Sequence, residues 1–317
     1  MALNTHLDEL YHLPAHDFPE PGATEELPAA DAVAWRISAS EETEEDWPET
    51  FARFGATVDL TRVRALIVGQ WEDAYDSGPG DVIEALLAAR DRLPALRALF
   101  LGDMVFTECE ISWIQQTDVT ALLTAFPELE EFGVRGGEGL GWEVPRHERL
   151  RSLVVQTGGL PARVVRGIGA CELPALERLE LWLGTTWYGA DSEVADLEPV
   201  LSGARLPRLR HLALRNSDMQ DAVAAAVASA PVVTRLDVLD LSMGTLGDDG
   251  AAALLAGRPL THLKKLDLHH HYIGEPLRDR LRDALVPAGV ELDLDEGDAE
   301  EDREDDGTVH RFVSVGE

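Results

Sequence analysis

A short stretch in the C-terminal part of the chain gathers histidine and aspartate side chains that could bind a metal ion. His269, His270 and His271 are consecutive, and Asp240 and Asp267 precede them at equivalent places of a repeated pattern. A metal ion held by imidazole and carboxylate groups can activate water for hydrolysis. Adjacent residues of an extended chain point in opposite directions, so the three histidines together make a poor chelate. His269 can join Asp240 or Asp267; the alternative is that the histidines are solvated turn residues.

Other residues of reactive type lack the spacing that chemistry needs. Cys109 and Cys171 are the only cysteines, and two thiols outside any catalytic motif are expected to be buried bystanders. The glycines between Gly137 and Gly141 are followed by neither a helix nor a Lys-Ser/Thr pair, which argues against a phosphate loop. Since no Ser/His/Asp or Cys/His arrangement is recognisable, we expect no enzyme activity and no cofactor.

The charge of the chain narrows the class of partner. It carries 59 acidic and 27 basic residues, a net charge of −32, which repels phosphate backbones and anionic lipids. A protein partner with a basic patch is favoured instead, with nucleic acid and membrane excluded; the oligomeric state stays open. The first residues form no signal peptide and no apolar run could span a bilayer, so a cytoplasmic location is expected.

The elements that must position these residues are repeats. Nine copies of a six-residue pattern, with apolar residues at its first, fourth and sixth places, recur at spacings of 21 to 33 residues. The fourth-place residues, here called the middle anchors, are Leu66, Leu99, Phe132, Leu153, Leu179, Leu212, Leu239, Leu266 and Leu292. Trp35 and Ile37 fit an earlier strand. Each copy predicts one strand that buries its anchors only by stacking on its neighbours.

Parallel strands need crossovers, and helical periodicity appears between the copies. The helices are expected at residues 81–92, 117–125, 161–168, 193–201, 218–229, 248–255 and 276–285. The 21-residue interval between Phe132 and Leu153 is expected to lack a helix.

The segment LDLSMGTLGDDGAAALL, which starts at Leu239, resembles the ribonuclease-inhibitor-like class of leucine-rich repeats. The resemblance implies an α/β horseshoe solenoid, with a parallel sheet on the concave face and helices on the convex face. The chain departs from the class at the turn position, where Ser217, Gly244 and His271 replace Asn or Cys. We divide it into an N-terminal cap with the first strand (1–58), the solenoid (59–295), and an acidic tail with a short strand-like segment (296–317).

The chain also resembles a family of actinobacterial leucine-rich-repeat proteins that has no assigned activity. The segments His12–Pro21 and Arg311–Glu317 carry this resemblance. Genes of that family often lie near those of ATP-grasp and radical-SAM-type enzymes. The resemblance therefore implies, as an alternative, an accessory subunit of an enzyme in a small-molecule pathway.

Side chains at the variable places of the pattern face away from the core and could form a binding surface. We expect a non-catalytic scaffold that binds a protein through Phe100, Arg135, Trp182, Arg215, Asp240, Asp267 and His269. The alternative for the apolar half, which contains Phe100, is coverage by the N-terminal segment of the same chain. A less favoured alternative function is a metal-dependent hydrolase at Asp240, Asp267 and His269.

The C-terminal tail is strongly acidic. Nine of residues 295–306 are Asp or Glu. The segment does not match a calcium loop, because Gly297 stands where such a loop needs Asp or Asn as a ligand. We expect a solvated tail there. Residues 308–315 alternate like a strand, which either caps the edge of the last repeat or pairs with a partner's sheet.

Overall fold

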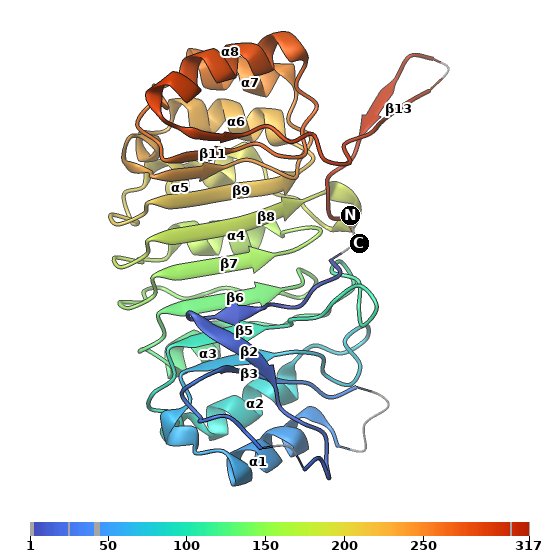
Figure 1. Ribbon diagram of the computed structural model, residues 1–317, viewed down its shortest axis with the longest axis vertical. Coiled ribbons are helices and arrows are strands. Elements are labelled where there is room, and N and C mark those ends of the chain that lie inside the picture. The colour runs from blue at the N-terminus through green and yellow to red at the C-terminus, as the bar shows by residue number, and fades with distance from the viewer. Residues whose placement is uncertain (1–2, 25, 41–44, 305, 317) are drawn as a thin grey trace.

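The computed structural model describes residues 3–24, 26–40, 45–304 and 306–316. Its main feature is a sheet of twelve strands that lie in space in the order of the chain (Figure 1). β1 and β2 pair antiparallel, and all later neighbours in this sheet pair parallel. The strands are β1 (Glu9–Leu10), β2 (Leu13–Asp17), β3 (Ala34–Ile37), β4 (Ala65–Val68), β5 (Ala98–Leu101), β6 (Glu131–Arg135), β7 (Ser152–Gln156), β8 (Arg178–Gly184), β9 (His211–Ser217), β10 (Val238–Asp240), β11 (Lys265–Asp267) and β12 (Glu291–Asp293).

The predicted anchors set the register of this sheet. Each middle anchor from Leu66 to Leu292 is the register partner of the next, and Trp35 extends the series by one strand. A slip of one residue would turn the anchors out of the core, so burial fixes the pairing. The expected mixed α/β architecture, in which each repeat adds one strand to a long parallel sheet, is therefore confirmed.

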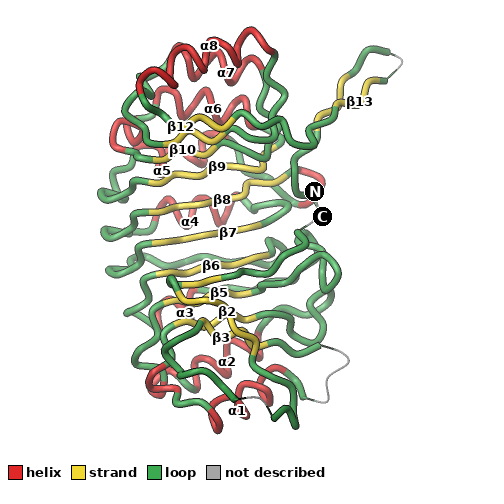
Figure 2. Tube along the Cα trace, viewed as in Figure 1, coloured by secondary structure: helices red, strands yellow, loops and turns green. Residues whose placement is uncertain are grey.

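The α-helices lie on one side of the sheet (Figure 2). They are α1 (Trp47–Thr57), α2 (Gly80–Ala88), α3 (Thr120–Ala125), α4 (Ala162–Ala170), α5 (Glu198–Ser202), α6 (Gln220–Ser229), α7 (Asp248–Ala256) and α8 (Glu275–Leu285). Short 3-10 helices are η1 (Leu60–Arg62), η2 (Arg90–Arg92), η3 (Thr186–Tyr188), η4 (Val194–Leu197), η5 (Pro231–Arg235) and η6 (Val286–Ala288). As expected, no helix lies between β6 and β7, an interval that is fully described. We call the other side of the sheet the open face.

Helix α1 was not expected from the sequence, although its start carries a recognisable signal. Asp46 and Glu49 form a capping box, and Pro48 occupies the first turn. Phe54 of α1 packs against Phe18 and Trp35, which closes the first turn of the core. Among the described residues, none of the helices has the length and apolarity to cross a membrane.

The acidic tail forms a hairpin rather than an irregular segment. β13 (Glu301–Arg303) pairs antiparallel with β14 (Val309–Arg311), and Figure 1 shows the hairpin projecting from the body. The expectation that residues 308–315 pair with the last repeat is wrong, because β14 pairs with β13 and the residues beyond it dock elsewhere.

Candidate functional site

The N-terminal strap, residues 3–17, lies across the first half of the open face. Ala34, Ala65 and Ala98 are register partners, and their small side chains leave a shallow apolar trough beside Phe100. The strap fills this trough with Leu7, Leu10, Tyr11, Leu13 and Ala15. Phe100 is consequently 3% exposed, so the expectation of an exposed partner-binding residue is wrong. The alternative, coverage by the chain's own N-terminal segment, is confirmed.

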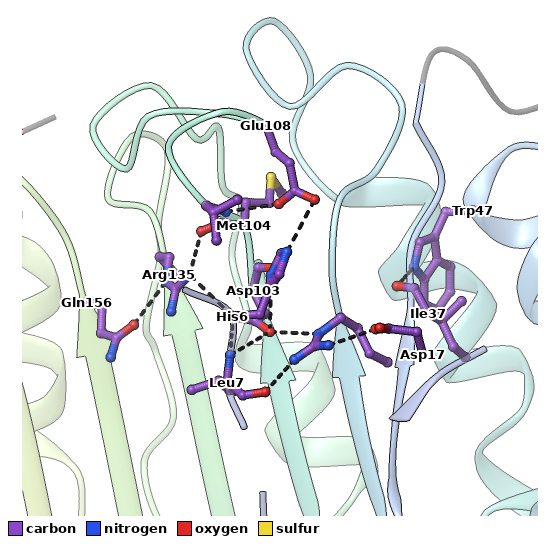
Figure 3. Close-up of polar contacts among 12 residues, drawn as sticks. His6, Leu7, Asp17, Ile37, Trp47, Asp103, Met104, Glu108, Arg135 and Gln156 are labelled. Atoms are coloured by element: carbon purple, nitrogen blue, oxygen red, sulfur yellow. Dashed lines mark hydrogen bonds and ion pairs between the residues drawn. The ribbon is translucent and has the colours of Figure 1, made fainter. Parts of the chain in front are cut away.

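A buried carboxylate anchors the strap to the sheet (Figure 3). Asp103, directly beyond β5, is fully buried and accepts hydrogen bonds from Arg36 Nε at 2.8 Å and from the backbone N–H of Leu7 at 3.1 Å. Arg135 lies 3.3 Å from the same carboxylate and is 2% exposed. Arg36 also pairs with Asp17 of the strap at 2.7 Å. Arg135, expected at a partner interface, is therefore buried in an intramolecular ion network.

His6 adds a third cation to this network. Its Nδ1 lies 3.6 Å from the Asp103 carboxylate, and its Nε2 lies 3.4 Å from Glu108. Hydrogen bonds to Asp103 and Glu108 raise the pKa of His6 to about 10. Burial alone would raise the pKa of Asp103, but the His6 hydrogen bond and the Arg135 and Arg36 guanidiniums hold it below its usual range. The ionised network ties both ends of the strap to the body.

A second strap, residues 312–316, crosses the C-terminal end of β9 and the turns beyond β10 and β11. Three residues there have positive φ, namely Asn216 near the end of β9 (56°), Met243 (66°) and His270 (53°). This left-handed conformation is costly for residues other than glycine and reorients the chain at each strand end. All three contact the C-terminal strap. Asn216 Nδ2 donates to Val315 O at 2.6 Å, and Val315 N donates to Asn216 Oδ1 at 3.0 Å. Ser314 N donates to Met243 O at 2.8 Å, and His270 Nε2 lies 3.0 Å from Phe312 O.

The two straps meet at Trp182. Leu3 of the N-terminal strap and Val315 of the C-terminal strap pack in one cluster with Trp182 and Met243. Trp182 is 5% exposed, and its indole N–H donates to Glu180 at 2.8 Å. The expectation of an exposed aromatic anchor at Trp182 is wrong, because this side chain is occupied by contacts within the chain.

Beyond Trp182 the open face carries charged side chains. Asp240, Asp267 and Asp293 are register partners on β10, β11 and β12, as the repeat pattern predicts. Arg215 of β9 lies 3.3 Å from Asp240 and 3.5 Å from Glu180. Burial raises the pKa of Asp240, and the nearby Arg215 charge opposes that shift. The predicted residues Arg215 and Asp240 are thus in contact. Asp240 and Asp267 were expected on an exposed partner surface, but they are only 7% and 8% exposed.

Asp267 and His269 also lie together. His269 Nδ1 is 2.7 Å from Asp267 Oδ1, and Lys265 Nζ is 3.0 Å from Asp267 Oδ2. The hydrogen bond to Asp267 raises the pKa of His269. Ligand atoms of Asp267, His269 and Asp293 lie within 4.8 Å of one another, which suits a metal ion. Among the described residues, Asp240 does not belong to this three-residue group. Asp293 supplies the carboxylate that the sequence led us to expect from Asp240.

A groove of about 650 Å³ lies beside the strap, over β6 to β8. Its walls include Tyr11, Arg64, Arg151 and Arg178, none of which was predicted as a functional residue. Arg151 and Arg178 have acidic neighbours, Glu177 at 3.0 Å and Glu180 at 2.6 Å, whereas Arg64 lies over the Tyr11 ring. Arg178 stands one residue before the middle anchor Leu179, a position that could have indicated the open face. Nothing in the sequence places Tyr11 in the same groove.

The two cysteines are buried, as expected. Burial raises the pKa of Cys109 to about 12 and that of Cys171 to about 11. Neither thiol is therefore activated as a nucleophile at neutral pH.

Comparison with known proteins supports the fold. A solved structure from Bacteroides fragilis, from a structural genomics consortium, aligns with a TM-score of 0.73 and 26% identity over 85% of this chain and 73% of that one. An internalin from Listeria monocytogenes aligns over 76% of this chain and 56% of its own with 14% identity, but its TM-score of 0.38 is too low to carry an argument. No family model matches the chain, and no curated protein matches its sequence. The chain is therefore similar in fold to a known structure, without a shown family.

Proposed function

We propose that the chain is a non-catalytic protein-binding scaffold whose contact surface is the charged cluster of Arg215, Asp240, Lys265, Asp267 and His269. One observation carries the proposal: the straps occupy the apolar part of the molecule's open face, whereas Lys265 and His269 of this cluster stay accessible above the buried Asp240 and Asp267. The side chains of Lys265 and His269 remain 32% and 34% exposed. Ion pairs hold the cluster in place, so a partner would meet preorganised charges.

The chain's only two lysines, Lys264 and Lys265, provide a matched test. Lys265 belongs to the cluster, whereas its neighbour Lys264 is 75% exposed and pairs with Asp237. Tagged wild type, Lys265→Glu and Lys264→Glu would each be added to extracts of the native host, treated with a carbodiimide, which couples the chain's many carboxylates to amines of a partner, and purified. A cross-linked protein recovered with wild type and Lys264→Glu but lost with Lys265→Glu is the expected result.

Unequal folding would complicate this comparison, so urea midpoints of all three proteins are measured first. If Lys265→Glu is destabilised, Lys265→Gln replaces it, with Lys264→Gln as its control. Equal recovery of the same protein with both variants would contradict binding at the cluster.

A metal-dependent hydrolase is the second candidate, and the Asp267, His269 and Asp293 geometry favours it. The ammonium of Lys265 already neutralises Asp267, which weakens this candidate. Calorimetric titration of metal-free protein with Zn²⁺ tests it. Tight binding that Asp293→Asn abolishes would favour the hydrolase.

We further propose a horseshoe of the ribonuclease-inhibitor-like class. Neighbouring strands lie about 4.8 Å apart, whereas packed helices need about 8–10 Å, so a helix layer on one side bends the sheet toward its open face. An actinobacterial accessory subunit would use the same cluster, and a stoichiometric partner enzyme in the cross-linking experiment would identify that role.

A further inference from the structure

A second groove, of about 610 Å³, lies between the C-terminal strap and the loop that follows β8. Phe106, Trp187 and Phe312 line it, and all three are large apolar residues that remain exposed. Trp187 is 91% exposed. Exposed aromatic side chains gathered in one groove are typical of a binding site, because leaving them in water is unfavourable.

The loop that carries Trp187 is tied to the body. The backbone N–H of Thr186 donates to Asp218 Oδ2 at 3.0 Å, and Gly184 bridges to Gly159. Gly184 has a φ of +74°, and a Cβ there would lie 2.0 Å from the carbonyl oxygen of Gly158. The backbone that carries Trp187 is therefore held at a defined place, so little backbone entropy would be lost when a ligand packs against this side chain.

The surroundings of the groove are acidic. Asp218 lines it and, among the described residues, has no cation within ion-pair distance. Arg311 and His310 also line the groove, but they lie 3.0 Å from Glu301 and 2.9 Å from Glu304. Arg311 and His310 belong to β14 of the hairpin, and the segment 295–306, which includes β13, holds nine acidic residues. A cationic ligand is therefore favoured.

We propose that this groove binds a basic segment of a partner protein that carries an apolar side chain. The apolar group packs between Trp187 and Phe312, and Lys or Arg side chains face Asp218 and the hairpin carboxylates. Nucleic acid and a second copy of this chain are disfavoured occupants, because both would bring further negative charge to a protein of net charge −32. The proposal goes beyond the charged cluster, since it concerns other residues and can fail or succeed separately.

The test uses three fluorescently labelled hexapeptides and the full chain. The first has Leu-Phe flanked by two Lys or Arg residues on each side, the second replaces Leu-Phe by Gly-Gly, and the third replaces the basic residues by Glu. Fluorescence anisotropy should show binding of the first peptide, with an affinity that falls as salt is added. The second peptide should bind much more weakly, and the third not at all.

Variants then locate the binding. Trp187→Ala should lower the affinity for the first peptide at least about tenfold, as expected for an anchoring aromatic residue. Trp113→Ala is the matched control, because Trp113 is 51% exposed and does not line the groove. Asp218→Asn keeps an acceptor for the Thr186 N–H and removes the charge, so it should also weaken the first peptide.

Four results would overturn the proposal. The first peptide could fail to bind wild type, or the acidic peptide could bind as tightly as the first. Wild type and Trp187→Ala could bind the first peptide with equal affinity. Light scattering could show that wild type is a dimer and that Trp187→Ala is not. The last result would assign the groove to a second copy of the chain. The charged-cluster lysine variants should leave peptide binding unchanged, which separates the two proposals.

Discussion

Replacing Asp103 by Asn perturbs the ion network that holds the N-terminal strap. The substitution keeps the side chain's size and removes a fully buried charge. Arg36 would retain its ion pair with Asp17 at 2.7 Å. Arg135 would lose the Asp103 carboxylate, which lies at 3.3 Å, and no other carboxylate of the described residues lies within ion-pair distance of it. Leaving a buried charge unpaired costs about 3–5 kcal/mol. If the strap detaches, water reaches the guanidiniums, so the loss is limited by the strap's own docking free energy.

Two measurements check this expectation. Urea unfolding gives the change in midpoint, and amide hydrogen exchange reports strap docking at Leu7, which donates to Asp103, and at Tyr11, which donates to Glu131. We expect a lower midpoint and faster exchange at both amides. Asp31→Asn is the matched control, because Asp31 forms an exposed ion pair with Arg62 at 2.8 Å. Such surface pairs contribute little.

The reasoning is refuted if Asp103→Asn shifts the midpoint no more than Asp31→Asn and leaves the strap amides protected. A double variant sharpens the test. Combining Asp103→Asn with Arg135→Met removes both charges, so the loss should be smaller than the sum of the two single losses. Additive losses would show that the two side chains do not interact.

Three further predictions concern titration and packing. Because the pKa of His6 is raised from 6.5 to about 10, its stabilisation is complete below pH 6.5 and is lost as the pH rises to about 10. The urea midpoints of wild type and His6→Asn should converge over that range, and a constant difference would be evidence against the ion pairs. Cys109 and Cys171 should resist iodoacetamide in the native protein at neutral pH and react in urea, since burial raises their pKa values to about 12 and 11; rapid native alkylation would contradict this. A Cβ on Gly133 would lie 2.2 Å from the Phe100 ring, so Gly133→Ala should destabilise the chain by about 1–3 kcal/mol, and Phe100→Leu should recover part of that loss. Unfolding midpoints that do not differ would rule out this clash.

The repeat pattern alone determined the solenoid. Leu99, Phe132 and Leu153 could be aligned from their spacing because each strand buries alternate residues and a register slip would expose them. The same rule placed Asp240 beside Asp267 on the open face. The capping box of Asp46 and Glu49 was also readable, so α1 was predictable in principle. These features depend on residues close together in the sequence or on one repeated period.

The tertiary structure alone decided which open-face residues stay accessible. Phe100 and Trp182 occupy the same kind of variable position as Arg215, yet the straps bury the first two. The contacts responsible join residues far apart in the chain, such as Leu7 with Asp103 and Asn216 with Val315. Docking of a strap depends on a matching surface that exists only after the repeats have stacked. No local periodicity encodes that match, and this is why the sequence could not show that the straps bury Phe100 and Trp182.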